Sequence, residues 1–273
     1  MHTEPNLEPS RREGLKLHLR LVQAAGVVYR VVSLRPGTGV RFSTNRFHDT
    51  WHILTDGGGA FVLARLLWGL SFQKQPNTVV LIDRPHLVPT PFDADRADRI
   101  LVAMPGTPTD ADHLRALAAA LRRSRVPDRT IRFHTFGLEE VVGWTWQEWR
   151  RHGHVLDAAR PHERIDRRAG MLCYVAPPAI LRAEAAMIHR TPPSRYGSYH
   201  YLVERGRWPE GEVQVFSNFA DRLSAARVAR REMLGDDDRP IVEDEERWAV
   251  QERAEAGHAR LLRARRGAKE ERD

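Results

Sequence analysis

The stretch that decides the fold is His52-Ile-Leu-Thr-Asp56-Gly57-Gly58-Gly59-Ala60, which leads into a strongly apolar run from Phe61 to Leu70. Apolar residues recur at helical spacing within that run, and its only charged residue is Arg65. A helix of this composition must be buried, because nearly every side of it is apolar. The stretch therefore predicts an extended segment, a tight glycine turn and a helix inside the core.

The segments that precede this stretch indicate antiparallel strands. Leu15 to Leu21 alternates apolar and polar residues, which places its leucines on one face of a half-buried strand. Val27 to Leu34 is rich in β-branched residues, and a turn at Arg35 to Gly39 separates it from a further extended run, Val40 to Phe47. The simplest arrangement is an antiparallel meander.

The segments that follow the glycines indicate strands that alternate with helices. Thr78 to Asp83 and Arg99 to Met104 are continuous apolar runs, as expected for strands covered on both faces. A helix is expected from Thr109 to about Arg123, and the next strand is Ile131 to Phe136. This order predicts an α/β fold, with the N-terminal meander leading into a mostly parallel sheet with helices packed on it.

The C-terminal part reads as a smaller ββα unit followed by a terminal helix. Two strands, Tyr199 to Glu204 and Glu212 to Phe216, precede a helix from about Asn218 to Leu234. The final helix runs from about Val242 to Arg266, with acidic residues in its first turn and arginines in its last, as the helix dipole favours.

The expected domain organisation has four parts. A disordered tail, residues 1–14, precedes an α/β domain, residues 15–150. Residues 151–168 hold many arginines and histidines with little apolar periodicity, which is typical of a linker or loop. Residues 169–273 form the smaller α+β region with the ββα unit and the charged terminal helix.

Composition sets broad limits on function. The net charge of +7 and the isoelectric point near 10.1 permit nucleic-acid binding, but 40 of the 43 basic residues are arginine, which indicates a compositional bias as much as a phosphate-binding surface. Cys173 is the only cysteine, so no cysteine-based zinc site and no intrachain disulfide are expected. No apolar run reaches the length of a membrane span, and a cytoplasmic location is the expectation.

The first functional hypothesis is phosphate or nucleotide binding at the glycine turn. Backbone N–H groups of Gly57, Gly58 and Gly59 at the start of a helix could hold an anionic group, and Asp83 could bind a ribose hydroxyl. His86 lies in the proline-rich loop after the same strand, at the end of the strand where such sheets bind ligands. No particular cofactor is indicated.

A second hypothesis is acyl transfer. The spacing His52-x-x-x-Asp56-Gly57 resembles the active-site signature of acyltransferases of the chloramphenicol acetyltransferase and condensation-domain kind, over roughly sixteen residues. The resemblance implies that His52 is the general base and that Asp56 has a structural role. The chain departs from that family in having Trp51 where the first histidine of the usual pair stands, and in the early position of the motif, so it is not assigned to the family.

A purely structural interpretation competes with both hypotheses. Asp56 would cap the helix, the glycines would allow a tight approach, and His52 would be a hydrogen-bonded, partly buried imidazole. His48 and His52 could share a metal only in a helix, and no metal site is predicted.

The third hypothesis, from a different class, is a non-catalytic adaptor that binds nucleic acid or protein. The segment from Trp144 to Arg151 combines aromatic surfaces with cations, the chemistry of a single-stranded nucleic-acid groove, and the terminal helix offers a second surface. Helical spacing would place only Trp146 and Trp149 on one face, which equally suits packing in the core. The candidate nucleic-acid residues are Trp146, Trp149, Arg150 and Arg151.

Overall fold

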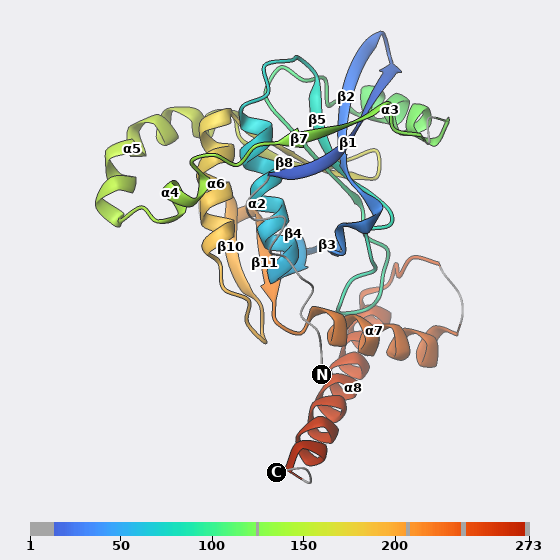
Figure 1. Cartoon of the computed structure of the whole chain (residues 1–273). Helices are drawn as coiled ribbons and strands as arrows, with labels where there is room; N and C mark the ends of the chain where they lie inside the picture. The colour runs from blue at the N-terminus through green and yellow to red at the C-terminus, as the bar shows by residue number, and fades with distance from the viewer. Residues whose placement is uncertain (1–13, 124–125, 206–207, 236–238, 271–273) are drawn as a thin grey trace.

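The computed structural model describes residues 14–123, 126–205, 208–235 and 239–270. They form two β-sheets and a set of helices that cover them (Figure 1). The predicted α/β fold is confirmed, including the N-terminal antiparallel strands and the C-terminal helix. All of the predicted tail, residues 1–14, lies outside the described residues except Gly14.

The larger sheet contains the N-terminal strand pair. In spatial order its strands are β7 (Arg129–Phe133), β1 (Leu15–Ala24), β2 (Val27–Leu34), β5 (Thr78–Ile82), β6 (Arg99–Ala103), β9 (Met171–Val175) and β8 (Arg164–Arg168). The pairs β2–β5 and β6–β9 are parallel, and the other neighbours are antiparallel.

The strand directions correct the expectation of a mostly parallel sheet. A parallel pair needs a crossover, usually a helix, whereas the chain between β5 and β6 is a loop without a helix, so these two neighbours run antiparallel. The third strand expected in the N-terminal meander also leaves this sheet and joins the smaller one.

The smaller sheet brings together segments that are far apart in the chain. Its strands in spatial order are β10 (Ser198–Arg205), β11 (Trp208–Phe216), β4 (Thr50–Asp56) and β3 (Phe42–Phe47). The β4–β11 pair is parallel, and the outer pairs are antiparallel. Both sheets thus contain strands from either side of the expected domain boundary, so the division at residues 150 and 169 does not follow the sheets.

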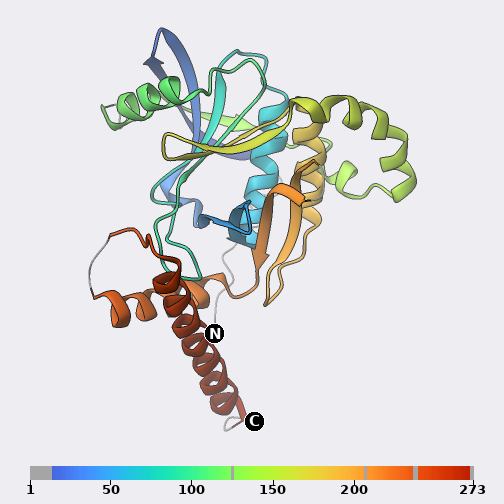
Figure 2. The same ribbon diagram turned by 180° about the vertical axis from the view of Figure 1, so that it is seen from behind.

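Helices pack on both faces of the larger sheet (Figure 2). The helices are α2 (Gly57–Ser71), α3 (Ala111–Arg123), α4 (Leu138–Val142), α5 (Trp146–Ala159), α6 (Pro178–Arg190), α7 (Phe219–Leu234) and α8 (Asp244–Glu270), with short 3-10 helices η1 (Pro36–Thr38) and η2 (Arg160–His162). On one face α3 covers a core of β-strand side chains. On the other, α2 and α6 pack against each other and against both sheets, which makes them the centre of the molecule.

The predicted linker, residues 151–168, is instead ordered as the rest of α5, η2 and β8. The strand β8 pairs only with β9 at the sheet edge, where Ile165 is buried and the neighbouring arginines are accessible to solvent. An edge strand needs only one apolar position facing the core, which is why its composition resembles that of a loop.

The pair α7–α8 extends away from the sheets and ends with the protruding second half of α8 (Figure 1). Small apolar residues hold the pair together, among them Ala226, Ala229, Val250 and Ala254. None of the helices in the described ranges combines the length and hydropathy required to span a lipid bilayer.

Candidate functional site

One face of the smaller sheet packs on the core, and the opposite face is covered by Phe219 at its Leu54 and Phe216 end and open at its His52 end. Ile53 of β4 and Val213 and Val215 of β11 are buried in the core that surrounds α2 and α6. Because successive side chains of a strand point to opposite faces, the residues between them point away from these helices. His52 and Glu212 are two such residues, and they occupy directly opposite positions on the parallel strands β4 and β11.

The register extends this pair into a polar row across the whole sheet. Asn45 of β3 lies opposite His52, and Tyr201 of β10 lies opposite Glu212. The row Asn45–His52–Glu212–Tyr201 therefore takes one residue from each strand. Gln214, two residues beyond Glu212, points to the same face of β11.

Hydrogen bonds hold the middle of this row in place. Nδ1 of His52 donates to Oδ1 of Asn45 over 2.7 Å, and Nε2 of His52 lies 3.2 Å from Oε1 of Glu212. The side-chain amide of Gln214 donates to the same Glu212 oxygen. Because Nδ1 of His52 donates its hydrogen to Asn45, Nε2 is the nitrogen that faces the Glu212 carboxyl group.

Burial governs the protonation of the pair, since the His52 side chain is 7% and the Glu212 side chain 10% exposed. Burial, with a smaller contribution from nearby His48, lowers the pKa of His52 to about 4. Burial raises the pKa of Glu212, and the hydrogen bond from Gln214 opposes that rise. Both effects disfavour the charged forms of the two side chains.

A groove of about 790 Å³ opens in front of the row. Its lining residues are Phe47, His48, Asp49, Thr50, His52, Tyr201, Pro209, Glu210, Glu212 and Gln214. The hairpin between β3 and β4 forms one wall, and β10 with the start of β11 forms the other. Aromatic rings beside a few convergent polar groups, with two shifted pKa values, are the features of a small-molecule site.

The structure assigns the glycine turn to helix capping and close packing. The carboxylate of Asp56 accepts a hydrogen bond of 2.8 Å from the backbone N–H of Gly59, as an N-cap residue does. A Cβ on Gly59 would lie 1.8 Å from Oγ1 of Thr55, so only glycine fits there. Gly57 packs against Pro193, and Gly58 lies next to the Asp56 carboxylate.

Asp83 and His86 lie in the loop that follows β5 of the larger sheet. The glycines follow β4 in the smaller sheet, whereas Asp83 follows β5 in the larger one, so the strand–turn–helix–strand segment is not a single nucleotide-binding unit. Asp83 is paired with Arg99 at 3.1 Å. His86 is buried, with Nδ1 3.2 Å from the carbonyl oxygen of Val40.

The tryptophan-containing segment is ordered around α5. Thr145 and Glu148 form a reciprocal cap at its start. The ring of Trp144 stacks on His152 at 4.5 Å between centroids and meets Trp149 edge-on at 5.2 Å. The side chains of Arg150 and Arg151 are exposed, and the side chain of Trp146 lies outside the described set.

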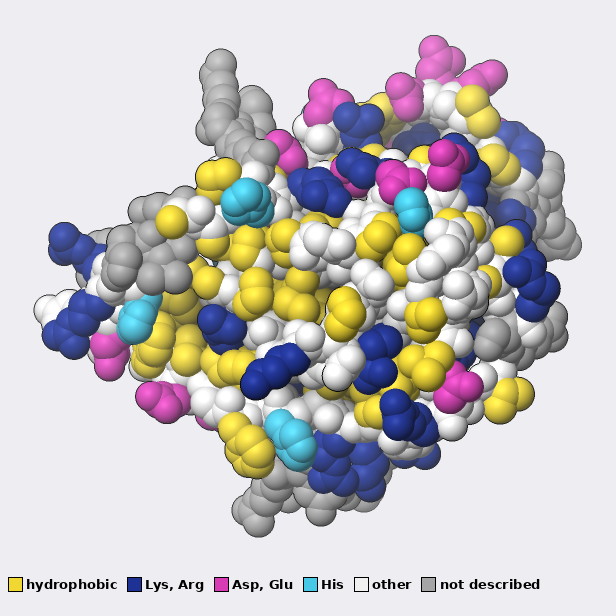
Figure 3. All heavy atoms as spheres, turned by 90° about the horizontal axis from the view of Figure 1, so that it is seen from above, with side chains coloured by type: hydrophobic (Ala, Val, Ile, Leu, Met, Phe, Trp, Pro, Cys, Tyr) yellow, Lys and Arg dark blue, Asp and Glu magenta, His cyan; other side chains and the backbone are white. Residues whose placement is uncertain are grey.

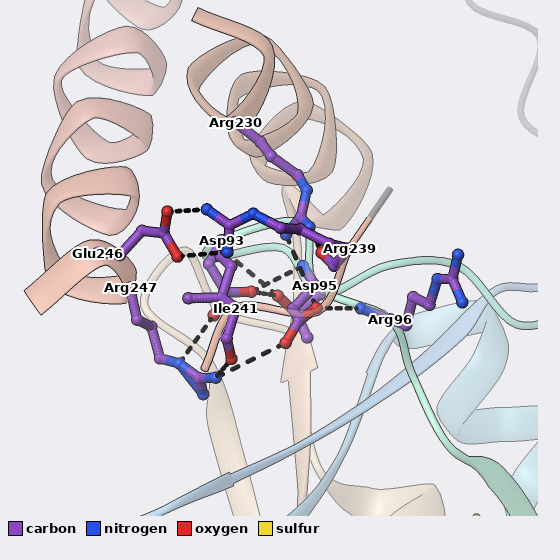
Figure 4. A network of polar contacts seen from close by, with 9 residues as sticks. Asp93, Asp95, Arg96, Arg230, Arg239, Ile241, Glu246 and Arg247 are labelled. Carbon is purple, nitrogen blue, oxygen red and sulfur yellow. Dashed lines mark hydrogen bonds and ion pairs between the residues drawn. The ribbon is translucent and has the colours of Figure 1, made fainter. Parts of the chain in front are cut away.

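A second polar cluster attaches α7 and α8 to the loop between β5 and β6 (Figure 4). Asp95 lies 3.7 Å from Nη1 of Arg230 and 3.6 Å from Nη2 of Arg247, and Asp93 lies 3.8 Å from Nε of Arg247. Asp93 also accepts from the backbone N–H of Asp95 and from the hydroxyl of Thr90 within its own loop. These contacts fix the position of the helical pair, and the cluster has a structural role.

Several residues of the groove were not predicted from the sequence. The sequence singles out His52. It does not single out the other residues beside His52, because strand pairing brings them there and periodicity does not specify which strands pair. These residues are Asn45, Glu212, Gln214 and Tyr201. The one local signal is the alternation Glu212-Val213-Gln214-Val215, which places two polar side chains on the outer face of an otherwise apolar strand.

Comparisons of the chain with protein-family models, with curated proteins and with solved structures found no match. The site is therefore interpreted from its own geometry. Within the described residues, no group of three or more His, Cys, Asp or Glu side chains has an arrangement that could hold a metal ion.

Proposed function

We propose that this protein binds a small polar organic molecule in the groove in front of His52 and Glu212 on the smaller sheet, and that the His52–Glu212 pair exchanges a proton with it. The protein would then be an enzyme that uses general acid–base catalysis. The ligand would lie between the aromatic walls, Phe47 and Tyr201, with its reacting group near the imidazole.

The single observation that carries this proposal is the buried, hydrogen-bonded His52–Glu212 pair in the groove. Asn45 and Gln214 fix the two partners from either side, while burial lowers the pKa of His52 and raises the pKa of Glu212. A charge that develops on the ligand would favour proton transfer to or from this pair. Proton transfer by a positioned group of this kind accelerates a reaction by on the order of 10²- to 10⁴-fold.

The position of Asp56 supports this choice of site over the glycine turn. A carboxylate at the N-terminus of α2 already occupies the position that a bound phosphate would take, and its charge would repel an anion. Acyl transfer with His52 as general base remains one reaction that suits the groove, and capping by Asp56 agrees with a structural role for that residue.

The first test uses p-nitrophenyl acetate, an activated ester whose hydrolysis needs only a base that removes a proton from water as it attacks the carbonyl carbon. Acetate and p-nitrophenolate are released, and the latter is followed by its absorbance. We expect His52→Gln and Glu212→Gln to lower the rate by about 10²-fold or more. His113→Gln is the matched control, because His113 also has a carboxylate neighbour, Asp110, but lies on the surface of α3.

A second measurement covers ligands that are not esters. The imidazole signals of His52 are followed by NMR while nucleotides, S-adenosylmethionine and acetyl-CoA are added one at a time. A ligand in the groove would shift the signals of His52 and leave those of His113 unchanged. If the ester is hydrolysed equally by all variants and no compound shifts the His52 signals, the proposal is wrong.

A further inference from the structure

The upper face of the molecule exposes aromatic side chains next to cations. Figure 3 shows apolar and basic side chains together over the middle of this face, with acidic ones mostly toward its margin. Phe136, after β7, is 82% exposed, and Phe72, at the end of α2, is 54% exposed. Single exposed apolar side chains are common, whereas neighbouring ones that form a patch can mark a binding surface.

Both aromatic side chains are held in place by their neighbours. The ring of His134 stacks on Phe136 with an angle of 7° between planes and 5.3 Å between centroids. The indole N–H of Trp68 donates to the carbonyl oxygen of Phe136 over 3.0 Å, and the Trp68 ring contacts Phe72 at 5.6 Å. Arg182 of α6 lies over the Phe72 ring at 5.2 Å. Trp68 thus links two exposed rings, each next to a polar or cationic group.

Cations line the sheet edge that precedes Phe136, with Lys16 and Arg132 on the face of β7 and β1 turned away from α2. Arg129 and Arg132 of the edge strand β7 are exposed, and Arg132 lies directly opposite Lys16 of β1. Like charges at directly opposite positions are unfavourable for sheet pairing, and an anionic partner would reduce their repulsion. The acidic residues Glu139 and Glu140 follow Phe136 in the chain, in α4. Their charge would repel an anionic chain and so direct it toward β7.

We propose that this upper face binds single-stranded nucleic acid, with bases stacked on Phe136 and Phe72 and phosphates bound by Arg132 and Lys16. Flat rings accept any base, and cations beside them bind the backbone, which is how sequence-tolerant single-strand sites are built. The surface is separate from the groove, so the proposal does not depend on His52. The surface is also formed by other residues than the α5 segment around Trp146 to Arg151.

The test is fluorescence anisotropy with a labelled oligo(dT) of about twelve nucleotides, a length within the range of such sites. We expect Phe136→Ala and Phe72→Ala each to weaken binding about five-fold or more, because each removes one stacked base. Arg132→Glu should weaken binding most at low salt and reduce the log–log salt slope by about 0.7 for the lost phosphate contact. A duplex of the same length should compete poorly, because its bases are already stacked.

Two control variants match these changes elsewhere on the surface. Tyr196→Ala removes another exposed ring that has an arginine, Arg195, over it, and Arg263→Glu makes the same charge change on α8. Both should bind oligo(dT) like the unchanged protein, and all variants should retain its circular dichroism spectrum. The proposal is overturned if the unchanged protein does not bind at about 50 mM salt, or if the controls weaken binding equally. It is also overturned if Arg132→Glu weakens binding while Phe136→Ala and Phe72→Ala do not, since that result describes a general polyanion surface.

Discussion

Nε2 of His52 and Oε1 of Glu212 lie 3.2 Å apart on neighbouring parallel strands, at the same register position. The two residues come from opposite ends of the chain, yet their side chains share one buried polar environment. Strand pairing fixes their separation more firmly than a loop could, which is the property that a proton-transfer site needs.

The first prediction concerns the charge state of His52. Because burial lowers its pKa to about 4, the imidazole should remain neutral from neutral pH down to about pH 4. NMR of the labelled histidine side chains measures this directly. His113 on α3, whose side chain is 29% exposed, is present in the same sample as a reference. A midpoint for His52 near the unperturbed value of about 6.5 would contradict the buried, neutral pair.

The second prediction is the effect of this pKa on stability. Between about pH 6.5 and pH 4 the unfolded chain binds a proton at His52 that the folded chain does not, so the free energy of unfolding falls as the pH decreases. Glu212 has the opposite sign, because a raised pKa stabilises the fold at low pH and loses that effect as the pH rises. The contribution of His52 to the pH dependence of the unfolding free energy is therefore measured by urea unfolding of the Glu212→Gln variant, in which position 212 does not titrate.

The reference for that measurement is the double variant His52→Gln, Glu212→Gln. The difference in unfolding free energy between single and double variant should change by at most about 1.4 kcal/mol per pH unit across this window and be constant above it. A difference that does not depend on pH would show that His52 titrates alike in both states.

The third prediction separates two adjacent glycines. Gly59→Ala should lower the free energy of unfolding by about 1–3 kcal/mol, because the new Cβ would overlap Oγ1 of Thr55. In Gly58→Ala the new Cβ lies 3.3 Å from Oδ1 of the capping Asp56, a much milder contact, and alanine favours the helix, so stability should change by less than about 1 kcal/mol. Urea unfolding of both variants tests this order, and the reverse order would refute it.

The fourth prediction concerns the attachment of α7 and α8. Asp95→Asn keeps the shape of the side chain but leaves Arg230 and Arg247 with less negative charge, so it should destabilise the docked pair by about 2 kcal/mol or more. Hydrogen exchange of residues 239–250 should then become faster than that of β5. Arg253→Gln, which breaks an exposed pair with Glu232, should change stability by less than about 1 kcal/mol. Equal effects of the two variants would argue against the structural role of the cluster.

The fifth prediction uses the single cysteine as a probe of unfolding. Cys173 is 1% exposed in the larger sheet, and burial raises its pKa to about 12, so the reactive thiolate is scarce in the folded protein. Labelling by an aromatic disulfide reagent should be slow in native buffer and rapid in concentrated urea. Fast labelling of the folded protein would show that β9 opens locally.

The elements of the fold that could be predicted from sequence are those with a local pattern. The alternation in Leu15 to Leu21 and the helical spacing after Gly59 identified β1 and α2, and two prolines marked the start of α6. What could not be predicted is which strands pair. Hydrogen bonding between strands depends on residues far apart in the chain, so neither the separation of β4 and β5 into different sheets nor their directions left a local signal.

The candidate site shows the same division. His52 was recognisable from its own neighbourhood, whereas its partner Glu212 lies in a strand whose pairing with β4 no short pattern reveals. Asp56 was recognisable as both a possible catalytic group and a helix cap, and the contact with Gly59 decides for the cap. The edge strand β8 could not be predicted because most of its residues are arginines and only Ile165 carries the apolar signal.

The order in which the strands occur along the chain has a consequence for biosynthesis. The hairpin of β3 and β4 leaves the ribosome early, but its partner strand β11 is translated only near the end. Until then one side of β4 has no strand to pair with, and unpaired strand edges promote aggregation. A nascent chain would therefore need a chaperone, or rapid burial of α2, to protect this edge. A ribosome that stalls before residue 208 would release a polypeptide that lacks β11 and therefore part of the groove.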